Sequence, residues 1–363
     1  MFKSLLRDKI LLSLLAGALL VKIFSLNESR VEKFYTYGIY PFVSRVLRIL
    51  FGWLPFSFGD LLYAVAVVYL LVKVFKFGRQ IKNRSLKEYI ARVFFRKFLR
   101  LILFVYLLFN VLWGLNYNRE GIAVQLGLKV QPYTVQDLDT ISGLLQQKLN
   151  RAALLVDSSK RVALSRNKVL FKEGVGAYAQ VEKDLPFLNY TQPSVKPSLF
   201  SHIGHFFGFT GYYNPFSGEA QIKTTVPFFL KPFVLTHEIG HQLGYAKENE
   251  ANFISFLACR SSKESEFRYS AYYEMYRYAS RELYRRDTIL AKAYKERLHP
   301  QVKKDNNELT QYHVRSANLI EPFVSSFYDE YLRMNNQPNG KLTYNEVVAW
   351  LIAYQKKYGK ESI

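Results

Sequence analysis

Three apolar runs in the first third of the chain restrict its possible folds more than any other feature. They cover residues 10–26, 56–75 and 99–115, and each is long enough to cross a hydrocarbon core of about 30 Å as a helix. All three are flanked by Lys or Arg, which argues against buried helices of a soluble domain. We therefore predict a membrane domain over residues 1–116, with three transmembrane helices in contact with the lipid bilayer.

The distribution of charge predicts how this membrane domain is oriented. The chain has 50 Lys and Arg against 29 Asp and Glu, a formal net charge of +21. Ten of the positive charges lie in residues 73–100, between the second and third runs, where Glu88 is the single acid. The positive-inside rule places this segment and the basic N-terminus in the cytoplasm, and residues 117–363 on the other side. Because topology explains so much of the charge, we expect no nucleic-acid partner.

The stretch between the first two runs has a different character. Residues 34–53 are rich in aromatic side chains and Arg. Such a segment can lie along the membrane surface as an amphipathic helix. We predict a helix there, on the same side as the C-terminal domain.

A motif in the second half of the chain predicts a metal site. It reads His237-Glu238-x-x-His241, and on a helix residues four apart share a face, so both imidazoles can bind one Zn²⁺. Glu238 can then take a proton from a water held by the metal. A catalytic zinc needs a third protein ligand, and Gly244 allows a turn that brings Glu248 back to it. We predict that His237, His241 and Glu248 bind Zn²⁺ and that Glu238 is the catalytic base.

The residues after this motif resemble a known class of peptidases. Glu248-Asn-Glu-Ala-Asn252 after HExxH is similar to the second motif of the gluzincin metallopeptidases. The resemblance implies that His237, His241 and Glu248 are the metal ligands and that Glu238 is the general base. It also implies that Asn252 steadies one of the ligands. The second motif follows His241 more closely than in most gluzincins. Glu250 therefore remains an alternative third ligand.

The chain as a whole resembles an uncharacterised family of bacterial membrane proteins that carries a domain-of-unknown-function label. The residues that carry this resemblance are 211–220, 236–244 and 250–253. It implies a mainly α fold, in which three N-terminal transmembrane helices precede a mostly helical zincin-like α+β domain with a small edge strand or sheet. That domain would cover residues 117–363 and lie outside the bacterial inner membrane.

These observations lead to a functional hypothesis and one alternative. The leading hypothesis is a membrane-anchored zinc metallopeptidase that hydrolyses a peptide or protein substrate. The alternative is a membrane binding or scaffold protein whose metal site is structural or inactive. An intact Glu238 argues against the alternative, and a structural zinc would be expected to have four protein ligands.

The segments around the motif predict several further elements. Residues 219–226 alternate enough for a short strand, which we expect at a sheet edge where the substrate backbone pairs, as in thermolysin-type peptidases. Tyr212 and Tyr213 are candidates to stabilise an oxyanion, whereas His202 and His205 are expected in loops or packing. Helices are predicted over 134–155, 168–183, 250–260, 265–287 and 312–334, with a polar link at 303–308.

Overall fold

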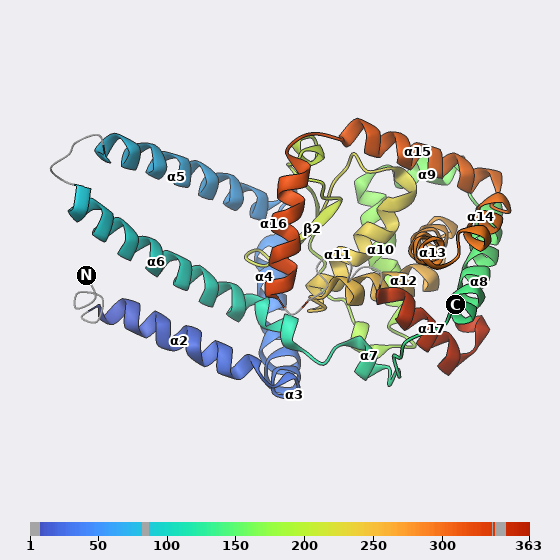
Figure 1. Ribbon diagram of the computed structural model, residues 1–363, viewed down its shortest axis with the longest axis horizontal. Helices are drawn as coiled ribbons and strands as arrows, with labels where there is room; N and C mark the ends of the chain where they lie inside the picture. Colours follow the sequence, from blue (N-terminus) through green and yellow to red (C-terminus); the bar gives the residue numbers. More distant parts are fainter. Residues whose placement is uncertain (1–7, 82–86, 336, 338–345) are drawn as a thin grey trace.

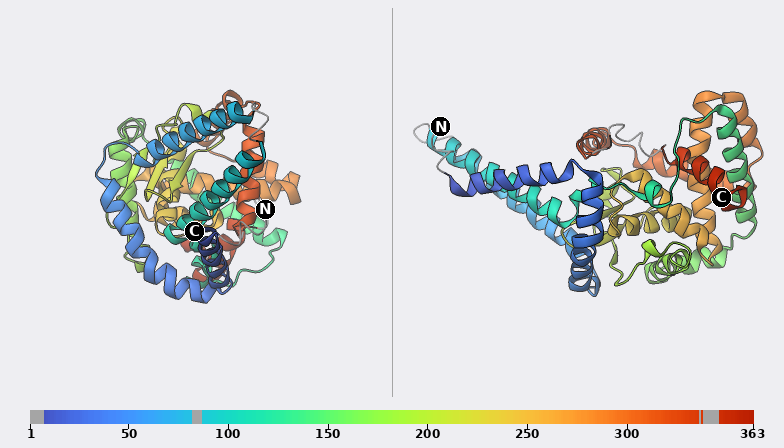
Figure 2. Two further views of the ribbon diagram at one scale, coloured as in Figure 1. Left: turned by 90° about the vertical axis from the view of Figure 1, so that its left-hand side faces the viewer. Right: turned by 90° about the horizontal axis from the view of Figure 1, so that it is seen from below.

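Three long helices project from one end of a mainly helical body (Figure 1 and Figure 2). They are α2 (Lys9–Ser25), α5 (Phe58–Ile81) and α6 (Lys87–Leu112). This computed structural model describes residues 8–81, 87–335, 337 and 346–363. The three helices contain most of the three apolar runs, but residues 56–57 precede α5 and residues 113–115 follow α6. α5 and α6 also extend into the basic segment 73–100, of which residues 82–86 lie outside the described part.

Among the described helices, one or two segments are long and apolar enough to span a membrane. Residues Phe58–Arg79 of α5 qualify alone, with a mean hydropathy of 1.9. α2 qualifies only together with Glu28–Gly52, from which it is bent by 104°. The final turns of α6 are apolar, but Arg96, Lys97 and Arg100 interrupt the run before them. These helices support an association with a membrane, but they do not establish the three predicted spans.

The predicted amphipathic segment is helical and crosses the base of the three projecting helices (Figure 1). It consists of α3 (Glu28–Arg30), a π-helix, η1 (Val31–Ile39), and α4 (Tyr40–Gly52). One side is buried against the body and the other is exposed and apolar. The buried side chains include Tyr35, Tyr40, Ser44 and Arg48, and the exposed ones include Phe34, Phe42, Ile49 and Trp53.

Long helices surround the larger of two apolar clusters, and the smaller one, which includes Tyr35, Trp113 and Tyr213, lies where the body meets the N-terminal helices. Thr134 and Asp137 form a capping box at the start of α8, which was predicted as a helix. The side chain of each residue accepts a hydrogen bond from the backbone amide of the other. The principal core helices are α8 (Val135–Leu154), α10 (Asn167–Val181), α11 (Lys231–Gln242), α12 (Glu248–Ser261), α13 (Ser265–Arg286) and α17 (Val347–Tyr358). Shorter helices complete it: η3 (Gly114–Asn118), α7 (Ile122–Gln125), α9 (Ser158–Leu164), η4 (Pro186–Leu188), η5 (Ile203–His205), η6 (Phe228–Leu230), α14 (Thr288–Glu296) and η8 (Lys360–Ser362).

The prediction of one helix over 312–334, after a polar link, is wrong. The chain instead forms α15 (Pro300–Ser316), which includes the supposed link, and α16 (Glu321–Met334). Asn318 separates them, because its side-chain oxygen accepts hydrogen bonds from the backbone amides of Ile320 and Glu321 at 2.8 and 2.9 Å. Pro322 in the first turn of α16 has no amide to continue a helix from α15.

A small sheet lies next to the motif helix, in the strand order β1-β3-β2. β1 (Val195–Pro197) is parallel to β3 (Glu219–Ile222), and β2 (Gly211–Asn214) is antiparallel to it. The strand predicted at 219–226 therefore exists over 219–222. Its predicted place at the sheet edge is wrong, because β3 is paired on both sides and buried throughout. β2 is the edge strand on the side of the motif.

Candidate metal centre

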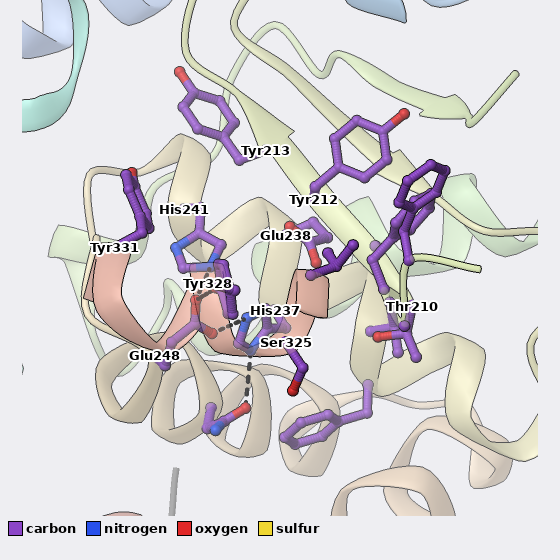
Figure 3. A pocket seen from close by; sticks show the side chains of 18 of the residues that line it. Thr210, Tyr212, Tyr213, His237, Glu238, His241, Glu248, Ser325, Tyr328 and Tyr331 are labelled. Carbon is purple, nitrogen blue, oxygen red and sulfur yellow. Dashed lines mark hydrogen bonds and ion pairs between the residues drawn. The ribbon is translucent and has the colours of Figure 1, made fainter. Parts of the chain in front are cut away.

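Helix α11 presents the two motif histidines on one face. Leu235 and Ile239 are buried in the core on the other face, which fixes the rotation of the helix. Gly244 then adopts a φ of +87°, a conformation that favours glycine, and the chain reverses into α12. This short turn places Glu248, the first residue of α12, opposite His237 and His241 (Figure 3).

The distances between these three side chains fit a zinc site. Oε2 of Glu248 lies 3.2 Å from Nε2 of His237, and Oε1 lies 3.8 Å from Nε2 of His241. One donor atom from each residue lies within 4.8 Å of the others. Zinc bonds of about 2.0–2.1 Å in a tetrahedron separate the donor atoms by roughly 3.3 Å, so small side-chain movements suffice to bind the ion. Three ligands leave the fourth position open.

Hydrogen bonds on the far side of each imidazole orient its free nitrogen towards Glu248. Nδ1–H of His237 donates to Oδ1 of Asn252 at 2.9 Å, and Nδ1–H of His241 donates to the backbone carbonyl of Tyr245 at 2.7 Å. In a neutral imidazole this leaves Nε2 with its lone pair, which is the form that a metal requires. Asn252 thus occupies the position that the gluzincin resemblance implied.

Tyr328 of α16 is a site residue that the sequence did not reveal. Its hydroxyl donates to Oε1 of Glu248 at 2.6 Å, and Tyr331 lies one turn further along the same helix (Figure 3). Among 27 tyrosines, no spacing connects Tyr328 to a motif 80 residues earlier. The hydroxyl holds the carboxylate of Glu248 in place beside the two histidines.

Glu238 lies beside the three candidate ligands, buried and close to β2. Its Oε2 atom has no hydrogen-bond partner among the described residues. A Cβ atom at Gly211 would overlap the Glu238 side chain, so glycine is required where the edge strand passes. Burial raises the pKa of Glu238 to about 8, although the charge of His237 opposes this shift. A carboxyl group whose pKa lies near neutrality is suited to accept and return a proton.

The pKa shifts of the three candidate ligands favour an ionised Glu248 and a neutral His241, whereas His237 retains its proton more readily. Burial raises the pKa of Glu248, but the hydrogen bond with His237 and the charges of both histidines outweigh burial and lower it to about 2. Burial lowers the pKa of His241 to about 4. Burial also lowers the pKa of His237, but its hydrogen bond with Glu248 overcomes this and raises the value above normal. Zinc must therefore displace a proton chiefly from His237.

Glu250, the alternative third ligand, lies outside this group. Its carboxyl group is buried beside Gly121 and near the guanidinium of Arg119. His237, His241 and Glu248 form the one set of three potential metal donors found in the described residues. The geometry favours Glu248 over Glu250, and the ligand role itself remains a prediction.

The other candidates from the sequence are also accounted for. The hydroxyl of Tyr212 donates to Asp60 at 2.5 Å and lies 2.8 Å from the hydroxyl of Ser198, and neither Tyr212 nor Tyr213 points towards the histidines (Figure 3). His205 lies 2.9 Å from the hydroxyl of Ser316 and is not part of the cluster. His202 is exposed on the same loop, as expected for a residue outside the metal site.

The N-terminal part of the chain completes the motif helix. Nε1–H of Trp113 donates to the carbonyl of His241 at 3.0 Å. The hydroxyls of Tyr40 and Ser44 donate to the carbonyl of Gln242 at 2.8 and 3.0 Å. The last carbonyls of a helix have no partners within the helix. The carbonyl of His241 also accepts the backbone amide of Gly244 at 3.0 Å, whereas the carbonyl of Gln242 is satisfied by the two hydroxyls.

A buried ion pair holds the turn after the motif helix. Arg119 binds the carboxylate of Glu32 through two nitrogens, at 3.0 and 3.1 Å, and donates to the carbonyl of Gly244 at 3.1 Å. Its guanidinium also lies 4.1 Å from the centre of the Tyr245 ring. Because the carbonyl of Tyr245 orients His241, this ion pair connects the membrane-proximal helix η1 to a candidate ligand.

A cavity of about 930 Å³ opens beside the cluster. Its walls come from α11, α12, α13, α16 and β2, and from the ends of α5 and α6 nearest the body. His237, Glu238, His241 and Glu248 all contribute to its surface. This volume is typical of a binding site for a small molecule or several residues of a peptide.

Comparison with known proteins gives a family without an assigned activity. Neither a curated protein nor a solved structure matches the chain. Residues 35–352 match the family described as "Protein of unknown function (DUF3810)". This range includes α11, α12 and α16, and therefore the whole candidate metal centre. Since the match spans most of the chain, the protein belongs to the DUF3810 family.

Proposed function

We propose that this protein is a membrane-anchored zinc metallopeptidase. The observation that carries the proposal is the convergence of two imidazole Nε2 atoms and the Glu248 carboxylate beside Glu238, at the surface of an open cavity. A structural zinc site would not require a buried carboxyl group with an oxygen that lacks a hydrogen-bond partner among the described residues. Peptide hydrolysis needs that group as a base.

The proposed reaction assigns a role to each side chain. Zn²⁺ bound by His237, His241 and Glu248 would act as a Lewis acid that polarises the substrate carbonyl and makes a water molecule more acidic. Glu238 accepts the proton of the attacking water and returns it to the leaving amine. Asn252 and Tyr328 keep the ligands in position through the hydrogen bonds described above.

The edge strand β2 supports a peptide as the substrate. Gly211 and Tyr212 lie on the cavity surface, and β2 pairs with β3 on its other side. An extended peptide can add to such an edge through backbone hydrogen bonds, which bind chains of many sequences. Gly211 also lies against Glu238, so a peptide paired with β2 would pass close to the base.

The proposed anchor consists of α2, α5 and α6 as three spans, with the N-terminus and the basic segment 73–100 in the cytoplasm. Exposed apolar side chains cover much of all three helices. α2 packs against α6, where a Cβ atom at Gly17 would lie 3.2 Å from the Leu107 side chain, and Phe77 of α5 stacks on Phe94 of α6 with ring centres 4.2 Å apart. Reporter fusions after residues 84 and 363 should read cytoplasmic and extracytoplasmic, respectively.

Metal content and turnover of matched variants test the proposal. We expect about one zinc per chain in the purified wild type and in Glu250→Ala, and loss of zinc in Glu248→Ala. Glu238→Gln should retain zinc and lose hydrolysis of peptides. Wild-type protein that takes up no zinc would favour a scaffold protein. Retained hydrolysis in Glu238→Gln would remove the assignment of the base.

A further inference from the structure

The cavity reaches the level at which the apolar surface of the projecting helices begins. Tyr63 of α5 lines the cavity, while Leu61 and Leu62 in the same turn are exposed. On α6, Phe109 lines the cavity and Val111 is exposed. Successive residues of a helix rise by about 1.5 Å, so each cavity-lining residue lies within about 3 Å, along the axis, of side chains that would contact lipid.

The candidate metal centre is close to these helix ends. Trp113 follows α6 directly, and its ring centre lies 5.9 Å from that of His241. On the other wall, Tyr63 contacts Phe216 edge to face, with ring centres 6.5 Å apart. Phe216 belongs to the turn between β2 and β3. The ring of Trp113 thus lies between His241 and the end of α6.

One part of the cavity rim is apolar, whereas the exposed Arg281 and Arg285 of α13 line another part. Two segments form the apolar part, the loop 199–209 and the beginning of α16. They are joined to each other and to α5, since Asn318 donates to the carbonyl of His205 at 3.0 Å and the amide of Leu199 donates to Asp60 at 2.7 Å. Their exposed side chains include Leu199, Ile203, Phe206, Leu319, Phe323 and Phe327.

This apolar rim has a definite position in the molecule. α16 lies at the end of the body from which the three helices project (Figure 1). Figure 2 shows it apart from the body end of α5, and the loop 199–209 connects the two through the hydrogen bonds given above. Several large apolar side chains exposed on neighbouring segments mark an interaction site, and Phe and Leu side chains can enter the boundary between lipid headgroups and acyl chains. Because the loop 199–209 joins this rim to α5, the same lipid layer would contact both.

We propose that the rim lies in the membrane surface and that the substrate is a polypeptide held on the bilayer and cut close to its membrane attachment. This inference rests on the proposed peptidase function and adds the substrate class. A chain that emerges from the bilayer beside α5 and α16 would reach β2 and Glu238 within a few residues. A chain in solution would have to approach through the lipid headgroups.

Spin labels test the membrane contact without any substrate. The single cysteine, Cys259, is buried, so Phe327→Cys and Ile289→Cys can each be labelled in the full chain in lipid nanodiscs. Phe327 and Ile289 are 79% and 82% exposed, but Ile289 lies on α14, at the opposite end of the body (Figure 1). We expect the label at 327 to collide mainly with dissolved oxygen and the label at 289 mainly with a water-soluble nickel chelate. Equal access of the chelate to both labels would overturn the proposed placement.

Lipid-anchored peptides test the substrate class. A mixed-sequence decapeptide pool would carry a palmitoyl chain either directly or after 15 prolines, a stiff spacer that holds it about 45 Å from the anchor. In proteoliposomes of the zinc-loaded protein, we expect at least a tenfold faster cleavage of the directly anchored pool. Equal rates for both pools and for the free decapeptides would overturn this inference and leave the peptidase function intact. No cleavage above that of Glu238→Gln would overturn the proposed function, and this inference with it.

Discussion

Replacement of Arg119 by methionine should strongly destabilise the protein at neutral pH. Arg119 is 1% exposed, and both nitrogens that bind Glu32 would be lost. Breaking a buried ion pair in this way ordinarily costs about 3–5 kcal/mol, because one charge remains buried without its partner. The buried carboxylate can escape this penalty by binding a proton. Protonation of a glutamate costs roughly 3.7 kcal/mol at pH 7 and roughly 1.6 kcal/mol at pH 5.5.

These magnitudes predict a loss that depends on pH. We expect Arg119→Met to lower stability by about 3–4 kcal/mol at pH 7 and by about half as much at pH 5.5, because proton uptake favours the variant fold as the pH falls. For a body of this size, 1 kcal/mol corresponds to roughly 2–4 °C in the unfolding midpoint. The midpoint should therefore fall by about 10 °C at pH 7. The assay is thermal unfolding of the full chain in detergent, with a chelator present.

Two controls separate the ion pair from other effects. The double variant Arg119→Met/Glu32→Gln removes the charge of Glu32, so it should be more stable than the single variant and have a weaker pH dependence, of which the remainder comes from Glu250 near residue 119. Glu361→Gln breaks the exposed pair between Lys148 and Glu361, 3.3 Å apart, and should shift the midpoint by no more than about 1 °C. An equal loss for Arg119→Met at both pH values, or a double variant as unstable as the single one, would refute this reasoning.

Three further outcomes follow from the contacts around the site. Gly59→Ala should lower the free energy of unfolding by about 1–3 kcal/mol, because the new Cβ would overlap the buried side chains of Asn214 and Ser217. Gly78→Ala on the same helix is the control: its Cβ would have no atom within 4 Å, so the unfolding midpoint should not change. Tyr328→Phe should weaken zinc binding about 10–100-fold, measured by competition with a chelator, through loss of the 2.6 Å hydrogen bond to Glu248; an unchanged affinity would mean that Tyr328 does not position the ligand. A chain that starts at residue 117 should not yield folded protein, because it lacks the hydrogen-bond donors Tyr40, Ser44 and Trp113. A soluble fragment that binds zinc would show that these donors are not needed.

The parts of the site that could be predicted from the sequence are those fixed by short-range geometry. His237 and His241 share a helix face by spacing alone, and Gly244 identifies the turn that returns Glu248 to them. All of these residues lie within 12 positions, so few chain conformations can separate them. The choice between Glu248 and Glu250 could not be made in this way, since it depends on which side of α12 faces α11.

The parts that could not be predicted depend on contacts distant in the sequence. The alternating pattern of residues 219–226 predicts a strand but does not reveal its parallel partner β1, so it cannot distinguish an edge strand from a central one. Glu219 reads as an ordinary strand residue, yet its carboxylate accepts the amide of Gly59 at 2.6 Å and so holds the first turn of α5. Hydrogen bonds between segments 160 residues apart leave no periodic signal in the sequence.

The donors that satisfy the end of α11 also bear on when the candidate metal centre can form. A chain is synthesised from its N-terminus, so Tyr40, Ser44 and Trp113 leave the ribosome long before His241 and Gln242. These donors are in place before the carbonyls that need them exist. The motif helix is therefore synthesised after the N-terminal helices that supply its hydrogen-bond donors. In a chain whose N-terminal helices are misplaced, the end of α11 would lack these donors. The proposed hydrolytic activity would then be confined to chains in which these N-terminal donors have reached their place.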